Sequence, residues 1–420
     1  MARLPNFLVI IRSEKLSGKG QGRGCLGVRK KERFVLGKRT FRSQKSKHFV
    51  LRIIPVNKGH FTQQEDHFTD RLCEYQSFHL NRNTYGLLPF KKGEPVSGDF
   101  SITELVTGTL EVRLKRCHAL TSGGYLIDYD AGEDDELTAS FHIPTDKEEE
   151  KDKRWDVILM ADPFEHLPSG IPNEKEISPR QPNALPKYAL SVLPSGQTDG
   201  SELGRHFLLI GRLRKNGNRC EVDGNFIPPC TSMSSHPDLK GYYTKFGQLV
   251  DSIEKASFDI LAKVENAEKQ TSLATNIGML CRHVMLCISD IYFSFRNEGQ
   301  YYSPLHFLNV FSTLAHRLYV CLSFMDKEDK EDLLKYFNEW NGITPGAYEG
   351  LLRENCGLLY NHHNIRQLMV TTERFLYLFN DLWTTLSRLE YIGKHKENIV
   401  VAERSRQPKE SSESRWNILD

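Results

Sequence analysis

The sequence lacks the features that mark secreted and membrane-spanning proteins. Its nine cysteines include no Cys-x-x-Cys pair, and an odd number of scattered cysteines indicates reduced thiols in a reducing compartment. No run of apolar residues reaches the roughly eighteen that a membrane-spanning helix needs. The apolar residues 7–11 form too short a run for a signal peptide, and they precede the basic residues instead of following them. We therefore expect a cytoplasmic protein.

Several motifs of common catalytic and metal sites are missing too. The sequence contains no Walker loop, no Gly-x-Ser-x-Gly, no His-Glu-x-x-His and no Glu-x-x-His pair. His60, Glu65 and His67 could approach one another on a helix, but surface or cap residues are the commoner outcome. His362 and His363 are adjacent and would face different ways on a helix. We predict no catalytic residue, no metal ligand, no cofactor and no small-molecule substrate, which favours a structural protein.

Basic charge is concentrated at the start of the chain. The 420 residues carry a net charge of +2, yet residues 1–48 hold most of the basic surplus, with Glu14 and Glu32 as their acidic residues. Their Gly, Ser, Lys and Arg content predicts disorder. Two interpretations remain open. The segment is either an arm that attracts nucleic acid or membrane phosphates, or an unnatural leader from a start-site error, because the next methionine is Met160.

A chain of this length should hold two or three domains. Between residues 49 and 230 the pattern is that of short strands. Leu110, Val112 and Leu114 alternate with polar residues, and residues 137–143, 155–160 and 206–213 read as further strands. Six prolines between residues 163 and 186 predict an extended loop there. We expect a mainly antiparallel β sandwich.

Between residues 231 and 325 the pattern changes to three consecutive helices, each with an apolar seam at steps of three and four. Residues of these seams that we expect to pack in this helical region are Leu239, Tyr242, Phe246, Leu249, Ile253, Ile260, Ile277, Leu280, Val284 and Ile291. Ser303 and Pro304 suit the N-cap and first position of the third helix. The seams either fill the core of one chain or join copies of a coiled-coil stalk. A small helical domain (326–393) and a flexible tail (394–420) would follow; its apolar end, 416–420, is either a docking peptide or a frayed terminus.

Two stretches resemble the TssK family of type VI secretion baseplate subunits. The block His60-Phe-Thr-Gln-Gln-Glu-Asp66 is similar to that family's Gln-His-Phe-Gln-Gln-x-Asp block, and the Tyr-Gly-Leu expected after it is here Tyr85-Gly86-Leu87. The strand 205–213 and the following Asp223-Gly-Asn-Phe-Ile-Pro-Pro229 resemble the family's strand and Phe-Ile-Pro-Pro lead into its neck helices. The resemblance covers residues 49–393, about the whole chain between leader and tail.

The resemblance implies an α+β multidomain protein that forms a homotrimer. It would have an N-terminal β-rich shell (49–230), a helical neck (231–325) and a C-terminal helical head (326–393). Its shell would bind the wedge proteins TssF and TssG, and its head would face components of the inner-membrane complex. Two departures stand out. The family's Trp-x-x-Gly-Met strand is replaced by Val56-Asn-Lys-Gly59, and the region after Met325 is short and helical.

On this basis we take His60, Phe61, Gln64, Asp66 and Phe68 as candidates for the wedge contact. Phe226, Ile227, Pro228 and Pro229 are candidates for the shell–neck junction, where two prolines would stiffen the connection. The leading hypothesis is a non-enzymatic adaptor of the baseplate, cytoplasmic and located at the inner face of the cell envelope when assembled. The alternative is a cytoplasmic coiled-coil protein that binds nucleic acid through its basic N-terminus; under the leading hypothesis nucleic acid is not an expected partner.

Overall fold

The computed structural model describes residues 35–36, 39–40, 57–90, 96–106, 108–131, 137–143, 153–172, 177–196, 203–217, 219–267 and 270–396. The chain divides between Glu65 and Asp66 into two units. The first holds the short antiparallel pair β1 (Val35–Leu36) and β2 (Arg39–Thr40), and the first residues of α1 (Lys58–His79). We expected no regular structure in the leader, so β1 and β2 differ from that prediction. The other residues of the leader, residues 49–56 and the tail residues 397–420 lie outside the described residues.

One sheet of the second unit is four-stranded and antiparallel, with the strand order β11-β10-β8-β9. Its strands are β8 (Arg154–Ser169), β9 (Asn183–Pro194), β10 (Phe207–Asn216) and β11 (Arg219–Val222). The strands predicted over 155–160 and 206–213 are confirmed as parts of β8 and β10. Residues 157–159 of β8 are buried without interruption, which explains their continuous apolar run.

The other sheet is five-stranded and antiparallel, and is organised around β5 (Thr109–Leu120). Its other strands are β3 (Gly86–Leu87), β4 (Gly98–Val106), β6 (Leu126–Asp130) and β7 (Leu137–His142). Leu110, Val112 and Leu114 of β5 are buried, as their alternation predicts. The two sheets share a core, in which the rings of Phe141 and Trp155 lie 5.2 Å apart.

The prediction of an extended loop over residues 163–186 is wrong at both ends of that stretch. β8 and β9 stay paired as far as Ser169 and Asn183, with an irregularity between Asp162 and His166. Strand β10 pairs with β8 only up to Met160, so among the described residues no third strand pairs with the outer part of the hairpin. Proline is tolerated there because strand edges do not need every N–H group.

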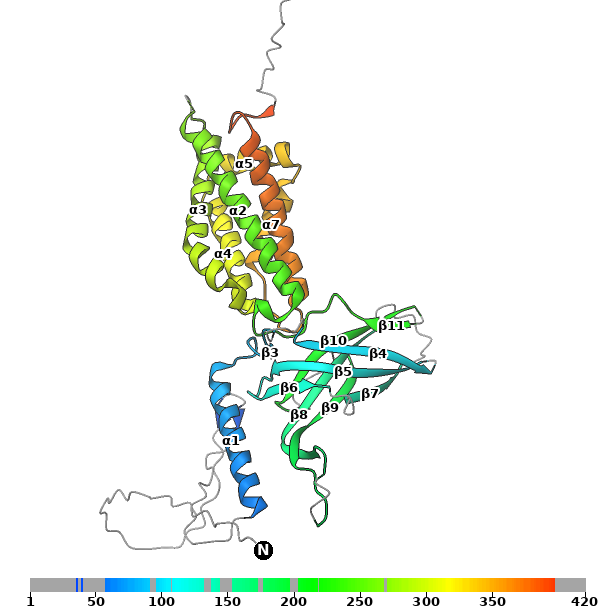
Figure 1. Ribbon diagram of the computed structural model, residues 1–420. Helices are drawn as coiled ribbons and strands as arrows, with labels where there is room; N and C mark the ends of the chain where they lie inside the picture. The colour runs from blue at the N-terminus through cyan, green and yellow to red at the C-terminus, as the bar shows by residue number, and fades with distance from the viewer. Residues whose placement is uncertain are drawn as a thin grey trace, which may run out of the picture. The chain divides into compact units, whose positions relative to one another are not determined.

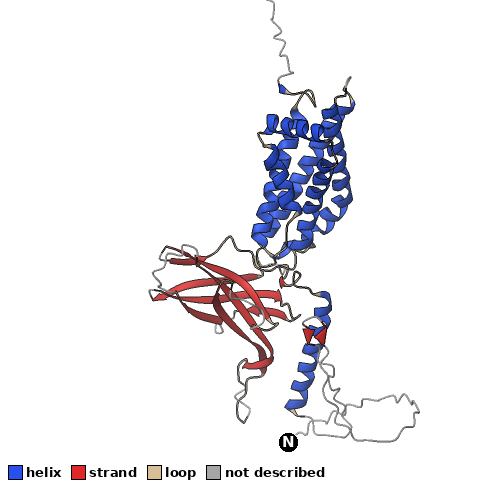
Figure 2. Ribbon diagram, turned by 180° about the vertical axis from the view of Figure 1, so that it is seen from behind, coloured by secondary structure: helices blue, strands red, loops and turns tan. Residues whose placement is uncertain are grey.

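Helices and strands are segregated in this unit (Figure 2). The helices are α2 (Pro237–Glu265), α3 (Ser272–Glu298), α4 (Pro304–Ser323), α5 (Lys327–Asn341), α6 (Pro345–Cys356) and α7 (Ile365–Arg388). The predicted start of α4 is confirmed, since the Ser303 side chain accepts a hydrogen bond from the His306 N–H and Pro304 is the first helical residue. Helix α6 was not predicted, although Thr344 and Pro345 form an N-cap and first turn of the same kind.

Helix α7 packs along α2, and the two run side by side in Figure 1. The Trp383 ring of α7 is fully buried, and its indole N–H donates to Ser257 Oγ of α2 at 3.0 Å. Each helix carries a narrow apolar stripe that covers the other. The region expected as a separate head therefore shares one core with the region expected as a neck.

Helix α3 with the short turn after it, Ser272–Tyr301, is long and apolar enough to cross a membrane by length and composition. A core helix of a soluble protein passes the same test. In this structure α3 packs against α2, α4 and α5.

Candidate functional site

The Phe-Ile-Pro-Pro stretch connects the last strand to the first helix of the bundle, and it is buried. Ile227 lies in the main core, while Phe226 packs against Ile158, Phe207 and Leu209 on the other face of the four-stranded sheet. The Arg212 guanidinium lies over the Phe226 ring, 4.4 Å from its centre. The connector is therefore held by side-chain packing as well as by its two prolines.

The connector also pairs with β3 by backbone hydrogen bonds. The Leu87 N–H donates to the Pro229 carbonyl at 2.8 Å, and the Thr231 N–H donates to the Leu87 carbonyl at 2.9 Å. Gly86 has a φ of +121°, and a Cβ atom there would lie 2.1 Å from the Pro229 carbonyl oxygen. Parts of the two stretches that resemble the TssK family, Tyr85–Leu87 and Phe226–Pro229, thus meet directly, and a glycine is required at the contact.

An arginine of α7, Arg366, binds the same connector. Arg366 Nε donates to the Asn225 carbonyl at 3.1 Å, and its Nη2 forms an ion pair with Asp238 in the first turn of α2. Its guanidinium also lies over the ring of Tyr242. One side chain therefore joins the connector, the start of α2 and the start of α7.

Two adjacent histidines, His362 and His363, form hydrogen bonds with Tyr85, the residue before β3. His362 Nε2 donates to the Tyr85 carbonyl at 2.7 Å, which leaves its Nδ1 to accept from Tyr360 Oη at 2.7 Å. Tyr85 Oη lies 2.6 Å from His363 Nε2. Burial lowers the pKa of His362 to about 4. The hydrogen bond to the Tyr85 carbonyl acts in the opposite direction and raises this pKa, but its effect is smaller. Burial also lowers the pKa of His363 and raises that of Tyr85 to about 12.

The sequence missed Arg366 and the two histidines as parts of this junction. The notion that adjacent histidines would face different ways on a helix does not apply, because both lie in the segment between α6 and α7. Their partners are distant in the chain: His362 and Tyr85 are 277 positions apart. No local pattern marks such a contact.

The candidate wedge residues all lie on α1. Phe61 (65% exposed) and Phe68 (58%) are exposed, and so is Gln64. His60 is partly buried, and its Nδ1 accepts a hydrogen bond from the Asn57 N–H at the start of the helix. Asp66 is partly buried, and its Oδ1 is buried without a hydrogen-bond partner among the described residues. The three exposed side chains are available to another molecule.

The candidate neck residues lie inside a single chain. Nine of the ten are buried by neighbouring helices, and Ile291 is partly buried. The apolar side chains that α2 and α3 leave exposed are different ones, Phe258, Leu286 and Phe293. A contact between copies through these helices would therefore have to use side chains outside the buried seams.

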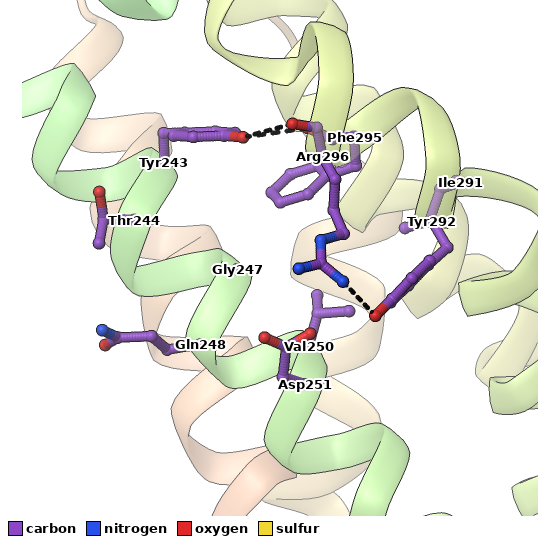
Figure 3. A pocket seen from close by; sticks show the side chains of 10 residues that line it. All are labelled: Tyr243, Thr244, Gly247, Gln248, Val250, Asp251, Ile291, Tyr292, Phe295 and Arg296. Carbon is purple, nitrogen blue, oxygen red and sulfur yellow. Dashed lines mark hydrogen bonds between the residues drawn. The ribbon is translucent and has the colours of Figure 1, made fainter.

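A cavity of about 220 Å³ lies between α2 and α3 (Figure 3). Gly247 leaves room at its floor, and Tyr243, Tyr292, Phe295 and Arg296 form part of its walls. The Tyr243 hydroxyl donates to the Phe295 carbonyl at 3.2 Å, and Arg296 Nη1 donates to Tyr292 Oη at 2.6 Å. The polar groups of these side chains are used in hydrogen bonds within the walls, so the cavity offers mainly apolar surface.

Across the described ranges no group of three or more His, Cys, Asp or Glu side chains is placed to hold a metal ion. The eight cysteines in these ranges are free thiols, and burial raises the pKa of Cys117 and Cys281 to about 12. What the described residues bring together is a set of packed connections and exposed apolar surfaces, which can bind other macromolecules.

No protein-family model matches this sequence, and no curated protein matches it either. Among solved structures it is similar to a crystal structure of TssK, with 14% identity over 79% of this chain and 69% of that chain and a TM-score of 0.49. It is also similar to TssK from EAEC in complex with a nanobody, at 15% identity over 77% and 68% of the two chains and a TM-score of 0.43. A chain of the TssK–TssF–TssG baseplate subcomplex of the type VI secretion system matches at 13% identity, over 80% of this chain and 99% of that chain, with a TM-score of 0.43.

Proposed function

We propose that this chain is a non-enzymatic structural adaptor of a type VI secretion baseplate. The observation that carries the proposal is the contact between Leu87 and Pro229. Part of each stretch that suggested the family from sequence, Tyr85–Leu87 and Phe226–Pro229, contributes to one junction between strands and helices. An accidental resemblance of two short segments so far apart in the chain would give no reason for them to be in contact.

In this proposal the two antiparallel sheets form a sandwich-like shell, and α2 to α4 form the neck of a homotrimer. The shell binds the wedge proteins TssF and TssG through the exposed side of α1, and α5 to α7 act as the head toward inner-membrane components. Because the three copies of a trimer are joined, their weak contacts with the partners act together and raise the overall binding affinity. The assembled protein lies in the cytoplasm at the inner face of the cell envelope.

Two measurements on the full chain test this function. Light scattering behind size exclusion should give three times the chain mass of 48.3 kDa, and TssF with TssG from the same source should co-purify with it. A monomer that binds neither protein at micromolar concentration contradicts the proposal.

Replacing Phe68 by Ala should weaken TssF–TssG binding, because an exposed aromatic ring on α1 would lose its contact area. We expect a loss of about tenfold, with the trimer mass unchanged. Leu359→Ala, at an even more exposed apolar residue outside α1, is the control. Loss of the trimer in the Phe68 variant would refute the assignment of α1 to wedge binding.

A further inference from the structure

Helix α3 has apolar side chains on two sides. Its seam residues Ile277, Leu280 and Val284 are buried in the bundle. A second line, formed by Met279, Leu286 and Phe293, repeats every seven residues; Leu286 is 57% exposed and Phe293 76%. A helix that is apolar on both sides is normally covered on both.

The Met279 end of this line opens into a cavity of about 370 Å³. Val320 and Phe324 from the end of α4 form another part of its wall, and Phe324 is 87% exposed. A large exposed ring beside an open apolar hollow is a place where an incoming side chain can be buried.

The charged side chains around this apolar line indicate which kind of molecule could cover it. Asp326 and Asp329 also line the cavity, and neither forms an ion pair with another described residue. Between the apolar positions, Asp290 of α3 accepts from Arg317 Nη2 of α4 at 2.7 Å. Charged side chains within the line disfavour lipid as the covering medium, and the two free carboxylates favour a basic group.

We propose that the outer face of α3, together with the cavity beside Phe324, docks an amphipathic helix of a partner protein. Its apolar side chains would recur every seven residues, and its basic end would meet Asp326 and Asp329. The line from Met279 to Phe293 is about 21 Å long, which suits a helix of roughly four turns. The exposed helix α1 of a second copy fits poorly, since its part after Glu65 carries Asp66, Asp70 and Glu74 against one arginine, Arg71, and no lysine. This docking site goes beyond the baseplate function, and it requires that the trimer contact proposed there leave the outer face of α3 free.

The test uses two fluorescein-labelled synthetic helices of about 18 residues with leucines on one face. One carries lysines at its C-terminal end and the other carries glutamates there. Fluorescence anisotropy with the full chain should show that the lysine peptide binds about tenfold more tightly. Leu286→Ser and Phe293→Ser should each weaken its binding by about tenfold or more. The double change Asp326→Asn and Asp329→Asn should weaken the lysine peptide and leave the glutamate peptide no weaker.

Leu359→Ser is the matched control, because Leu359 is 88% exposed and lies after α6, outside this surface. Unchanged thermal melting of each variant shows that the fold is intact. Equal binding of the two peptides, or full binding by the Leu286 and Phe293 variants, overturns the proposal. It is equally overturned if Phe293→Ser dissolves an oligomer of the full chain, or abolishes binding to phosphatidylcholine–phosphatidylglycerol vesicles.

Discussion

Gly86 lies where the backbone alone decides which residue fits. Its φ of +121° is in the region that favours glycine, and the Pro229 carbonyl occupies the place of a Cβ atom. The sequence did point to this segment, because Tyr85-Gly86-Leu87 belongs to the family resemblance. It could not show what touches the glycine, since Pro229 is far away in the chain.

Replacing Gly86 by Ala should therefore destabilise the protein by roughly 3 kcal/mol or more, from backbone strain and overlap with Pro229. Urea unfolding followed by circular dichroism measures the change. Gly350 in α6 is the control, because a Cβ atom there meets nothing within 4 Å. Gly350→Ala should stabilise the helix by about 0.5–1 kcal/mol. Equal effects of the two changes would contradict this account of Gly86.

Among the described helices, α2 and α7 make the most extensive contact with each other. Ser257 Oγ accepts the Trp383 N–H and donates to the Ile253 carbonyl at 2.8 Å, so both of its hydrogen-bonding roles are used inside the bundle. This hydrogen bond is buried between the two helices, whereas the Arg366–Asp238 and Lys245–Glu373 ion pairs join them nearer the surface. It fixes how the two helices are aligned along their length.

Ser257→Ala should cost about 1–3 kcal/mol, since the buried Trp383 N–H would lose its acceptor. Urea unfolding followed by circular dichroism measures the loss. Ser289→Ala is the matched change: the Ser289 hydroxyl also donates to the carbonyl four residues earlier, but it is exposed. That variant should stay within about 0.5 kcal/mol of the parent protein. A loss in Ser289→Ala equal to that in Ser257→Ala would exclude the Trp383 contact as the cause.

Heptad spacing predicted α2, α3 and α4 because a regular apolar stripe is a local property of the sequence. It could not decide between a core within one chain and a contact between copies, since both need the same stripe. Residues 163–186 misled the prediction for the opposite reason. Their prolines are typical of loops, and only the pairing of the two ends of this stretch with each other shows that the hairpin continues.

For the whole molecule, the histidines at the junction connect the stability of the fold to pH. The folded pKa of His362, about 4, lies below the ordinary value of 6.5. Between these two values the unfolded chain binds more protons than the folded one, so stability falls as the pH decreases. The contribution is complete above pH 6.5 and is lost as the pH drops toward 4. The lowered pKa of His363 acts in the same direction.

We therefore expect the free energy of unfolding to fall by up to about 3 kcal/mol between pH 7 and pH 4 through His362. His362→Gln can still donate to the Tyr85 carbonyl but does not titrate, so it should reduce this pH dependence. Urea titrations at several pH values compare the two proteins. A variant with the same slope as the parent would show that His362 is not responsible.

The hydrogen bonds between Leu87 and the connector have a topological consequence. Leu87 and Thr231 are 144 positions apart in the chain and are in direct contact. The stretch of chain between Leu87 and Thr231, with strands β4 to β11, thus forms a cassette. Its two ends contact each other at a single point, next to the helices. Loops within such a cassette can lengthen, shorten or be exchanged without altering where the chain re-enters the helical bundle. Evolution can reshape what the strands bind while leaving the helices unchanged.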